Sequence, residues 1–103
     1  MSVYNEPTDW KDTDDTVFKL RLFVTGTSAV SVRAINNLQK ILSEHLSDRY
    51  ELEIIDAHQQ PLLVMRDNVT AVPVLIKTHP GPTKRLIGDM SDKFKVLRGL
   101  GLS

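Results

Sequence analysis

The chain contains 103 residues, with 13 basic and 13 acidic side chains and no cysteine. This length predicts one domain, and the missing cysteines exclude disulfides, thiolate metal sites and thiol catalysis. The apolar runs are too short to cross a membrane and no signal peptide is recognisable, so we expect a cytoplasmic protein.

Charge is distributed unevenly along the chain. Residues 1–16 contain five acidic side chains against Lys11, whereas residues 17–103 contain twelve basic and eight acidic ones. The first segment shows no hydrophobic periodicity, so we expect it to be a flexible acidic arm. Residues 17–103 then form the folded domain, whose net charge of +4 either belongs to an ordinary solvated surface or binds an anion or an acidic partner. The basic residues have no aromatic platform among them, so nucleic acid is not an expected partner.

The first half of the domain predicts a strand, a helix and a second strand. Apolar and charged residues alternate from 17 to 25, and Phe23 adds an apolar side chain on the second face. Thr27 or Ser28 is a suitable N-cap for a helix whose apolar residues recur at helical spacing up to Leu46. A second alternating run follows from Tyr50 to Ile55. Such a unit predicts two parallel strands with a right-handed connection.

The second half is less regular. Residues 62–65 fit either a short helix after Pro61 or a strand, because so short a run does not distinguish the two. Residues 69–77 and 84–87 predict a hairpin, with Pro73 near its start and a turn at residues 79–82. Ser91 or Asp89 is the expected cap of a last helix from residue 92 to about 100, with an inner stripe of Phe94, Leu97 and Leu100. A hairpin entered through a proline and followed by a helix is typical of the C-terminal half of a thioredoxin-like domain.

Catalytic chemistry is not expected. The position after the first strand, where thioredoxin-like enzymes carry their redox pair, reads Thr27-Ser28-Ala29-Val30 and offers no thiolate. The three histidines show no spacing that indicates a metal site. We therefore expect no enzyme activity and no cofactor.

The order of these motifs resembles the KaiB family of circadian clock proteins, over residues 18–100. The similarity is strongest at residues 85–92. The stretches that carry it are residues 20–26, 31–34 with Leu38, 50–56 with Pro61, 71–75, 85–92, Val96-Leu97 and Gly99-Leu100.

The resemblance implies a non-enzymatic protein that binds KaiC, a RecA-like ATPase. Family members also sequester KaiA and displace the kinase SasA. They switch between a βαββααβ oligomer, a tetramer or dimer, and a thioredoxin-like βαβαββα monomer, of which only the monomer binds KaiC. For the isolated protein we expect the oligomeric arrangement.

Two sets of residues are candidates for these roles. The candidates for partner binding carry charge on the expected strands and hairpin: Lys19, Arg21, Glu51, Glu53, Lys77, Lys84 and Arg85. The candidates for fold switching are prolines and glycines of the second half and two residues next to them. They are Pro61, Val72, Pro73, Gly81, Gly88, Asp89, Gly99 and Gly101. We also expect Pro73 to be cis in the thioredoxin-like arrangement and slow proline isomerisation to help set the switching rate.

Several features depart from the family pattern. Val72 replaces a common threonine, Gly101 stands where aspartate is expected, and Glu51 and Glu53 make the second strand acidic. These differences favour a divergent member in a KaiC-like stress or signalling operon over a true clock, and both settings stay open. Two other hypotheses stay open, namely a glutathione-binding protein that uses the Pro73 backbone and a purely structural oligomer.

Overall fold

The structure is a computed structural model that describes residues 16–102. Almost all of the predicted acidic arm, residues 1–15, and the last residue, 103, lie outside the described residues. No helix within residues 16–102 is long and apolar enough to cross a membrane.

Seven elements follow one another in the thioredoxin-like order. The order is strand, helix, strand, helix, strand, strand, helix, which is the second of the two arrangements considered above. The structure therefore does not have the βαββααβ arrangement that we expected for the isolated protein. The elements are β2 (Phe18–Val24), α1 (Ala29–His45), β3 (Tyr50–Asp56), α2 (Pro61–Arg66), β4 (Val74–His79), β5 (Lys84–Ile87) and α3 (Lys93–Leu100).

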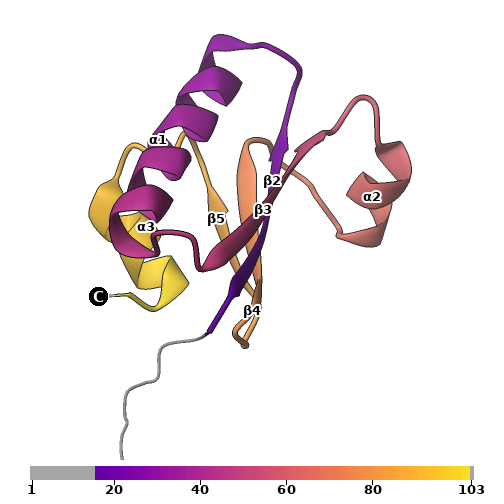
Figure 1. The fold of residues 1–103 in the computed structure, drawn as a ribbon. Coiled ribbons are helices and arrows are strands. Elements are labelled where there is room, and N and C mark those ends of the chain that lie inside the picture. Colours follow the sequence, from indigo (N-terminus) through magenta and orange to yellow (C-terminus); the bar gives the residue numbers. More distant parts are fainter. Residues whose placement is uncertain (1–15, 103) are drawn as a thin grey trace, which may run out of the picture.

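The four strands form one sheet with the order β3-β2-β4-β5. The pair β2 and β3 is parallel, as the strand–helix–strand pattern predicted, whereas β2 with β4 and β4 with β5 are antiparallel. Helices α1 and α3 cover one face of the sheet and α2 lies on the other (Figure 1). The sheet therefore separates two apolar clusters of different size.

The larger cluster lies between the sheet and helices α1 and α3. Strand β2 contributes Leu20, Leu22 and Val24, whose alternation places them on this face. The smaller cluster lies under α2 and consists of Phe23, Ile55, Val74 and Ile76. The buried Phe23 confirms that β2 is covered on both faces near its end.

Of the two predicted N-caps of α1, Thr27 and Ser28, the structure has Ser28. Its side chain accepts a hydrogen bond from the Ser31 backbone N–H at 3.3 Å. The buried residues Ala34, Leu38 and Leu42 then follow at helical spacing along the inner face. The cap and the apolar stripe together explain why this segment forms a long helix.

The ambiguous segment after β3 forms the helix α2. Pro61 occupies its first turn, where a missing N–H costs no hydrogen bond. Leu63 and Val64 pack against the smaller cluster, but Leu62 and Met65 are 77% and 74% exposed. No residue of α2 is buried, so this helix is weakly attached to the sheet.

The predicted hairpin β4–β5 forms, but β4 starts at Val74, directly after Pro73, so residues 69–73 of the predicted run lie outside the strand. The Val72-Pro73 peptide bond is cis, as expected for this arrangement, and the bonds preceding Pro80 and Pro82 are cis as well. The Pro73 carbonyl accepts a hydrogen bond from the Gly88 N–H at 3.0 Å. This bond closes the open end of the hairpin.

Helix α3 corrects two predictions. Its N-cap is Asp92, whose carboxylate accepts the Lys95 N–H at 3.1 Å, and neither Ser91 nor Asp89. Its buried residues are Val96, Leu97 and Leu100, whereas Phe94 is 70% exposed. A helix turns about 100° per residue, which places Phe94 roughly a third of a turn away from the centre of that buried stripe.

Gly99 lets α3 approach β5 closely. A Cβ atom at this position would lie 2.6 Å from Cδ1 of Leu86. Gly101 ends the helix in the left-handed conformation with a φ of 78°, the usual role of glycine at this position.

Candidate binding surface

Five of the seven predicted partner-binding residues lie on the face of the sheet that carries α2. They are Lys19 and Arg21 on β2, Glu51 and Glu53 on β3, and Arg85 on β5. The period of two along each strand places them there, opposite the main core. We call these five residues the charged face.

Ion pairs across the two parallel strands neutralise much of the charged face. The register places Lys19 beside Glu51 and Arg21 beside Glu53. Lys19 Nζ lies 3.7 Å from Glu51 Oε1, and Arg21 Nε lies 3.4 Å from Glu53 Oε1. The four side chains remain 31–68% exposed, so each pair contributes at most about 1 kcal/mol to stability. The acidic residues of β3 are thus partners of the basic residues of β2.

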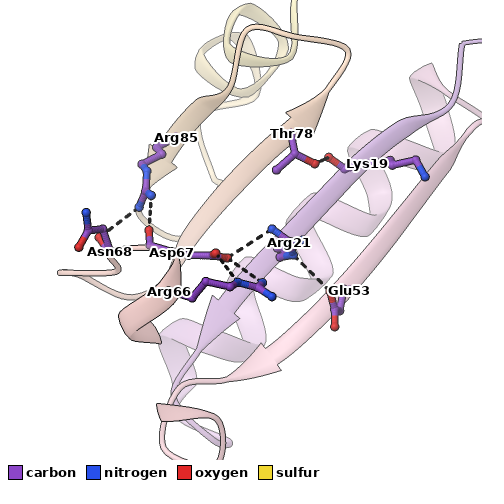
Figure 2. Close-up of polar contacts among 8 residues, drawn as sticks. All are labelled: Lys19, Arg21, Glu53, Arg66, Asp67, Asn68, Thr78 and Arg85. Carbon is purple, nitrogen blue, oxygen red and sulfur yellow. Dashed lines mark hydrogen bonds and ion pairs between the residues drawn. The ribbon is translucent and has the colours of Figure 1, made fainter. Parts of the chain in front are cut away.

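Asp67, which the sequence did not indicate, is the centre of the contacts between α2 and the sheet (Figure 2). Its carboxylate lies 2.9 Å from Arg66 Nε and 3.4 Å from Arg21 Nη1. Arg85 donates to the backbone oxygens of Asp67 and Asn68, the latter at 3.3 Å. Two strands thus hold the C-terminal end of α2 through charged side chains.

The surroundings of the Asp67 carboxyl group favour its ionised form. Its side chain is only 12% exposed, and burial opposes ionisation. The hydrogen bond from Arg66 outweighs this effect and lowers the pKa of Asp67, and the charges of Arg21 and Arg85 act in the same direction. Nothing in the sequence pattern indicated that Asp67 would contact the strands.

A shallow hollow of about 420 Å³ lies over β2 and β3, within the charged face. Lys19, Arg21, Glu51 and Glu53 line it, together with Thr78 of β4. The hydroxyl of Thr78 donates to the Lys19 carbonyl at 3.3 Å and fixes the strand end beside the hollow. The surface here is polar and open, which suits contact with a macromolecule better than enclosure of a small ligand.

Lys77, predicted to bind partners, is instead on the opposite face and buried. It is 5% exposed, and its amine donates to the carbonyls of Pro80 and Pro82, the latter at 3.0 Å. Lys84 and Lys77 both line a second hollow, which lies away from the charged face. The structure therefore divides the seven predicted residues into a group of five and a group of two.

The candidates for fold switching lie at the ends of elements or in the connections between them. Asp89 has the most contacts among them. Its carboxylate accepts the Ser91 N–H at 3.0 Å and the Arg33 Nε–H at 3.3 Å, and its carbonyl accepts the Asn37 amide at 3.0 Å. The hydrogen bonds from Ser91, followed by that from Arg33, lower the pKa of Asp89. These contacts join the β5–α3 connection to α1.

A cluster of hydroxyl groups occupies the position where a thioredoxin-like enzyme would carry thiols. Ser31 is fully buried, and its Oγ accepts the Thr25 N–H at 3.0 Å and the Ser28 hydroxyl at 2.8 Å. These groups serve as hydrogen-bond partners for the first turn of α1. Residues 16–102 also contain no group of three or more potential metal-ligating side chains.

Comparison with solved structures defines the class of this protein. The N-terminal domain of Synechococcus elongatus SasA superimposes with a TM-score of 0.68 at 24% identity, covering 100% of this chain and 95% of that one. Thioredoxin 3 from the mitochondria of Saccharomyces cerevisiae matches with a TM-score of 0.67 at 15% identity, over 85% and 80% of the two chains. The chain thus has a thioredoxin-like fold that lacks the thiols of thioredoxin.

Sequence comparison identifies the family within this class. The model of the KaiB domain matches residues 21–102. The circadian clock protein KaiB3 of Synechocystis sp. is 46% identical over 83 residues, which cover 81% of each chain. The circadian clock oscillator protein KaiB of Prochlorococcus marinus strain MIT 9312 is 45% identical over 83 residues, covering 81% of this chain and 79% of that protein. The chain belongs to the KaiB family.

Proposed function

We propose that this chain is a regulatory binding protein, without enzyme activity, that docks on a KaiC-like RecA-type ATPase. The observation that carries the proposal is the thioredoxin-like order of a KaiB-family chain. By the resemblance described above, this is the arrangement in which family members bind KaiC. The relatives are named circadian clock proteins, which supports a role in timing or in a related signalling operon.

The shared fold suggests a competitor. The N-terminal domain of SasA has the same arrangement of elements as this chain. By the resemblance described above, displacement of a SasA-like kinase and capture of a KaiA-like protein belong to the same proposal, and the shared fold is consistent with the first of these.

The charged face is the proposed docking surface. A row of basic side chains on β2 lies beside a row of acidic side chains on β3, and these side chains are exposed enough to form ion pairs with a partner instead. Such a pattern contributes to specificity and register more than to affinity. A complementary pattern of charges on the ATPase would therefore orient the docked chain.

The direct test is capture of the host's own KaiC-like ATPase on immobilised full-length chain. Capture should depend on the nucleotide bound to the ATPase, so it is measured with ATP, with ADP and without nucleotide. Absence of binding in all three conditions would overturn the proposal.

A charge exchange separates docking from stability. Lys19→Glu with Glu51→Lys preserves the cross-strand pair but reverses the pattern that a partner meets. We expect the free energy of unfolding to be unchanged and the Kd to rise about tenfold, equivalent to about 1.4 kcal/mol. Lys93→Glu with Glu44→Lys, which exchanges an exposed ion pair between α3 and α1 and also leaves the net charge unchanged, is the matched control. Binding of the exchanged variant with wild-type affinity would exclude the charged face.

Fold switching is a second part of the proposal, and Gly88 provides its test. Its φ of 126° is accessible almost only to glycine, so Gly88→Ala should destabilise this arrangement by about 1–3 kcal/mol. If an alternative arrangement exists, a second set of amide NMR resonances should appear. Gly81→Ala is the control, since its φ is not positive and an added Cβ meets no atom within 4 Å. A single set of resonances with reduced stability would contradict the proposal.

A further inference from the structure

A hollow of about 290 Å³ lies at the end of the sheet where β2 begins. The turn between β4 and β5 forms one side of it through Pro80 and Pro82, and the C-terminal end of α3 forms another. Phe18, the first residue of β2, lines it as well. Figure 1 shows the start of β2 and the β4–β5 turn at the same end of the sheet.

The charges that line this hollow are all positive. Lys77, Lys84 and Arg98 line it, and no acidic side chain does. Within residues 16–102, none of these three makes an ion pair. We call this site the basic hollow. It differs from the charged face, where each basic residue of β2 has an acidic neighbour on β3.

Lys77 makes the basic hollow receptive to an anion. The amine is held by two carbonyl oxygens of the turn, which stabilise its charge only partly. Burial, followed by the charge of Lys84, lowers the pKa of Lys77. A carboxylate placed in the hollow would offset both effects, since an opposite charge nearby favours the protonated amine.

The chain itself contains a matching anion. Residues 1–15 carry Glu6, Asp9, Asp12, Asp14 and Asp15 against a single Lys11. The last of these acids precedes Phe18 by three residues. An extended chain spans at most about 3.3–3.6 Å per residue, so three or four residues of chain allow the backbone of Asp15 and Asp14 a distance of at most roughly 10–15 Å from Phe18. Covalent attachment therefore keeps these acids at high effective concentration beside it.

We propose that the acidic N-terminal segment docks into the basic hollow of its own chain, with its carboxylates against Lys84 and Arg98. The two charges, −4 on residues 1–15 and +4 on residues 17–103, then neutralise each other locally. The docked segment covers one end of the sheet and leaves the charged face free. The inference does not depend on the proposed ATPase partner.

Paramagnetic relaxation measures the docking in the full-length chain. The chain has no cysteine, so Thr8→Cys provides a unique site for a spin label. We expect the label to broaden the amide resonances of Gly81 and Gly99, which line the hollow. The amide of His58, at the opposite end of the sheet, should keep its intensity. Salt of about 1 M, where the Debye length is about 3 Å, should abolish the broadening.

Charge variants distinguish specific docking from simple proximity. Lys84→Glu with Arg98→Glu should remove most of the broadening at Gly81 and Gly99, and Asp14→Lys with Asp15→Lys in the same chain should restore it. The matched control is Lys40→Glu with Lys95→Glu, which changes net charge equally at exposed positions outside the hollow.

Two outcomes would overturn the inference. One is broadening that is the same in the wild type, the Lys84 and Arg98 variant and the control, because a freely moving segment would give that result. The other concerns a mixture of spin-labelled chains with isotope-labelled chains that carry no spin label. Full broadening of the isotope-labelled chains in this mixture would show that the segment docks on a second copy. Dispersed amide spectra of each variant show that it is folded.

Discussion

Ser31 offers a sharp test of how the hydroxyl cluster stabilises the start of α1. Ser31→Ala removes the fully buried Oγ that accepts the Thr25 N–H at 3.0 Å and leaves this partly buried N–H without its partner. An unsatisfied buried donor costs about 1–3 kcal/mol. The higher helix propensity of alanine returns about 0.5 kcal/mol. We therefore expect a net loss of about 0.5–2.5 kcal/mol in the free energy of unfolding.

Urea denaturation measures this loss, with an unchanged m-value expected because the exposed surface on unfolding stays the same. In thermal unfolding, each kcal/mol should lower Tm by about 4–8 °C. Val32→Ala is the control, since this neighbouring residue is 44% exposed and should change stability by no more than about 0.5 kcal/mol. Ser31→Ala and Ser28→Ala should combine non-additively, because their hydroxyls contact each other at 2.8 Å. Equal stability of the Ser31 and Val32 variants would refute the reasoning.

Two further predictions concern Asp67 and Asp92. The lowered pKa of Asp67 stabilises the fold above the unfolded-state pKa of about 3.9, and this stabilisation is lost as pH falls through the lower folded-state pKa. Asp67→Asn should therefore unfold at less urea than the wild type at pH 7, with the difference shrinking below about pH 4; a constant difference would contradict this. Asp92→Ala should lose the N-cap of α3 and about 1 kcal/mol of stability. Circular dichroism during thermal unfolding measures this loss of stability. A variant with the Tm of the wild type would show that Asp92 is not the N-cap that stabilises α3.

Long periodic segments could be predicted from the sequence, because many residues agree on the same pattern. Helix α1 has four turns of apolar spacing and a serine cap, and strand β2 alternates from Phe18 to Leu22. The eight residues of α3 gave too little repetition to define its rotation, so Phe94 was assigned to the core instead of Val96. Residues 62–65 became a helix only through tertiary packing on the smaller cluster, which no local pattern contains.

The candidate site was predictable in part for a similar reason. Alternation placed Lys19, Arg21, Glu51 and Glu53 correctly on one face, but their pairing depends on the register between two strands. Lys77 was assigned to the surface because lysine is rarely buried. The carbonyls that hold it come from a turn whose path the sequence pattern does not define.

The unequal clusters on the two faces of the sheet imply unequal local stability. In the described part of the chain, the cluster beneath α1 and α3 contains fourteen buried side chains, whereas that beneath α2 contains four. Segments with little buried apolar area open at a lower free energy than the whole domain unfolds. Transient detachment of α2 would therefore expose Phe23 and Ile76 while the rest of the domain stays folded. The contacts of Arg21 and Arg85 with residues 67 and 68 would oppose this opening.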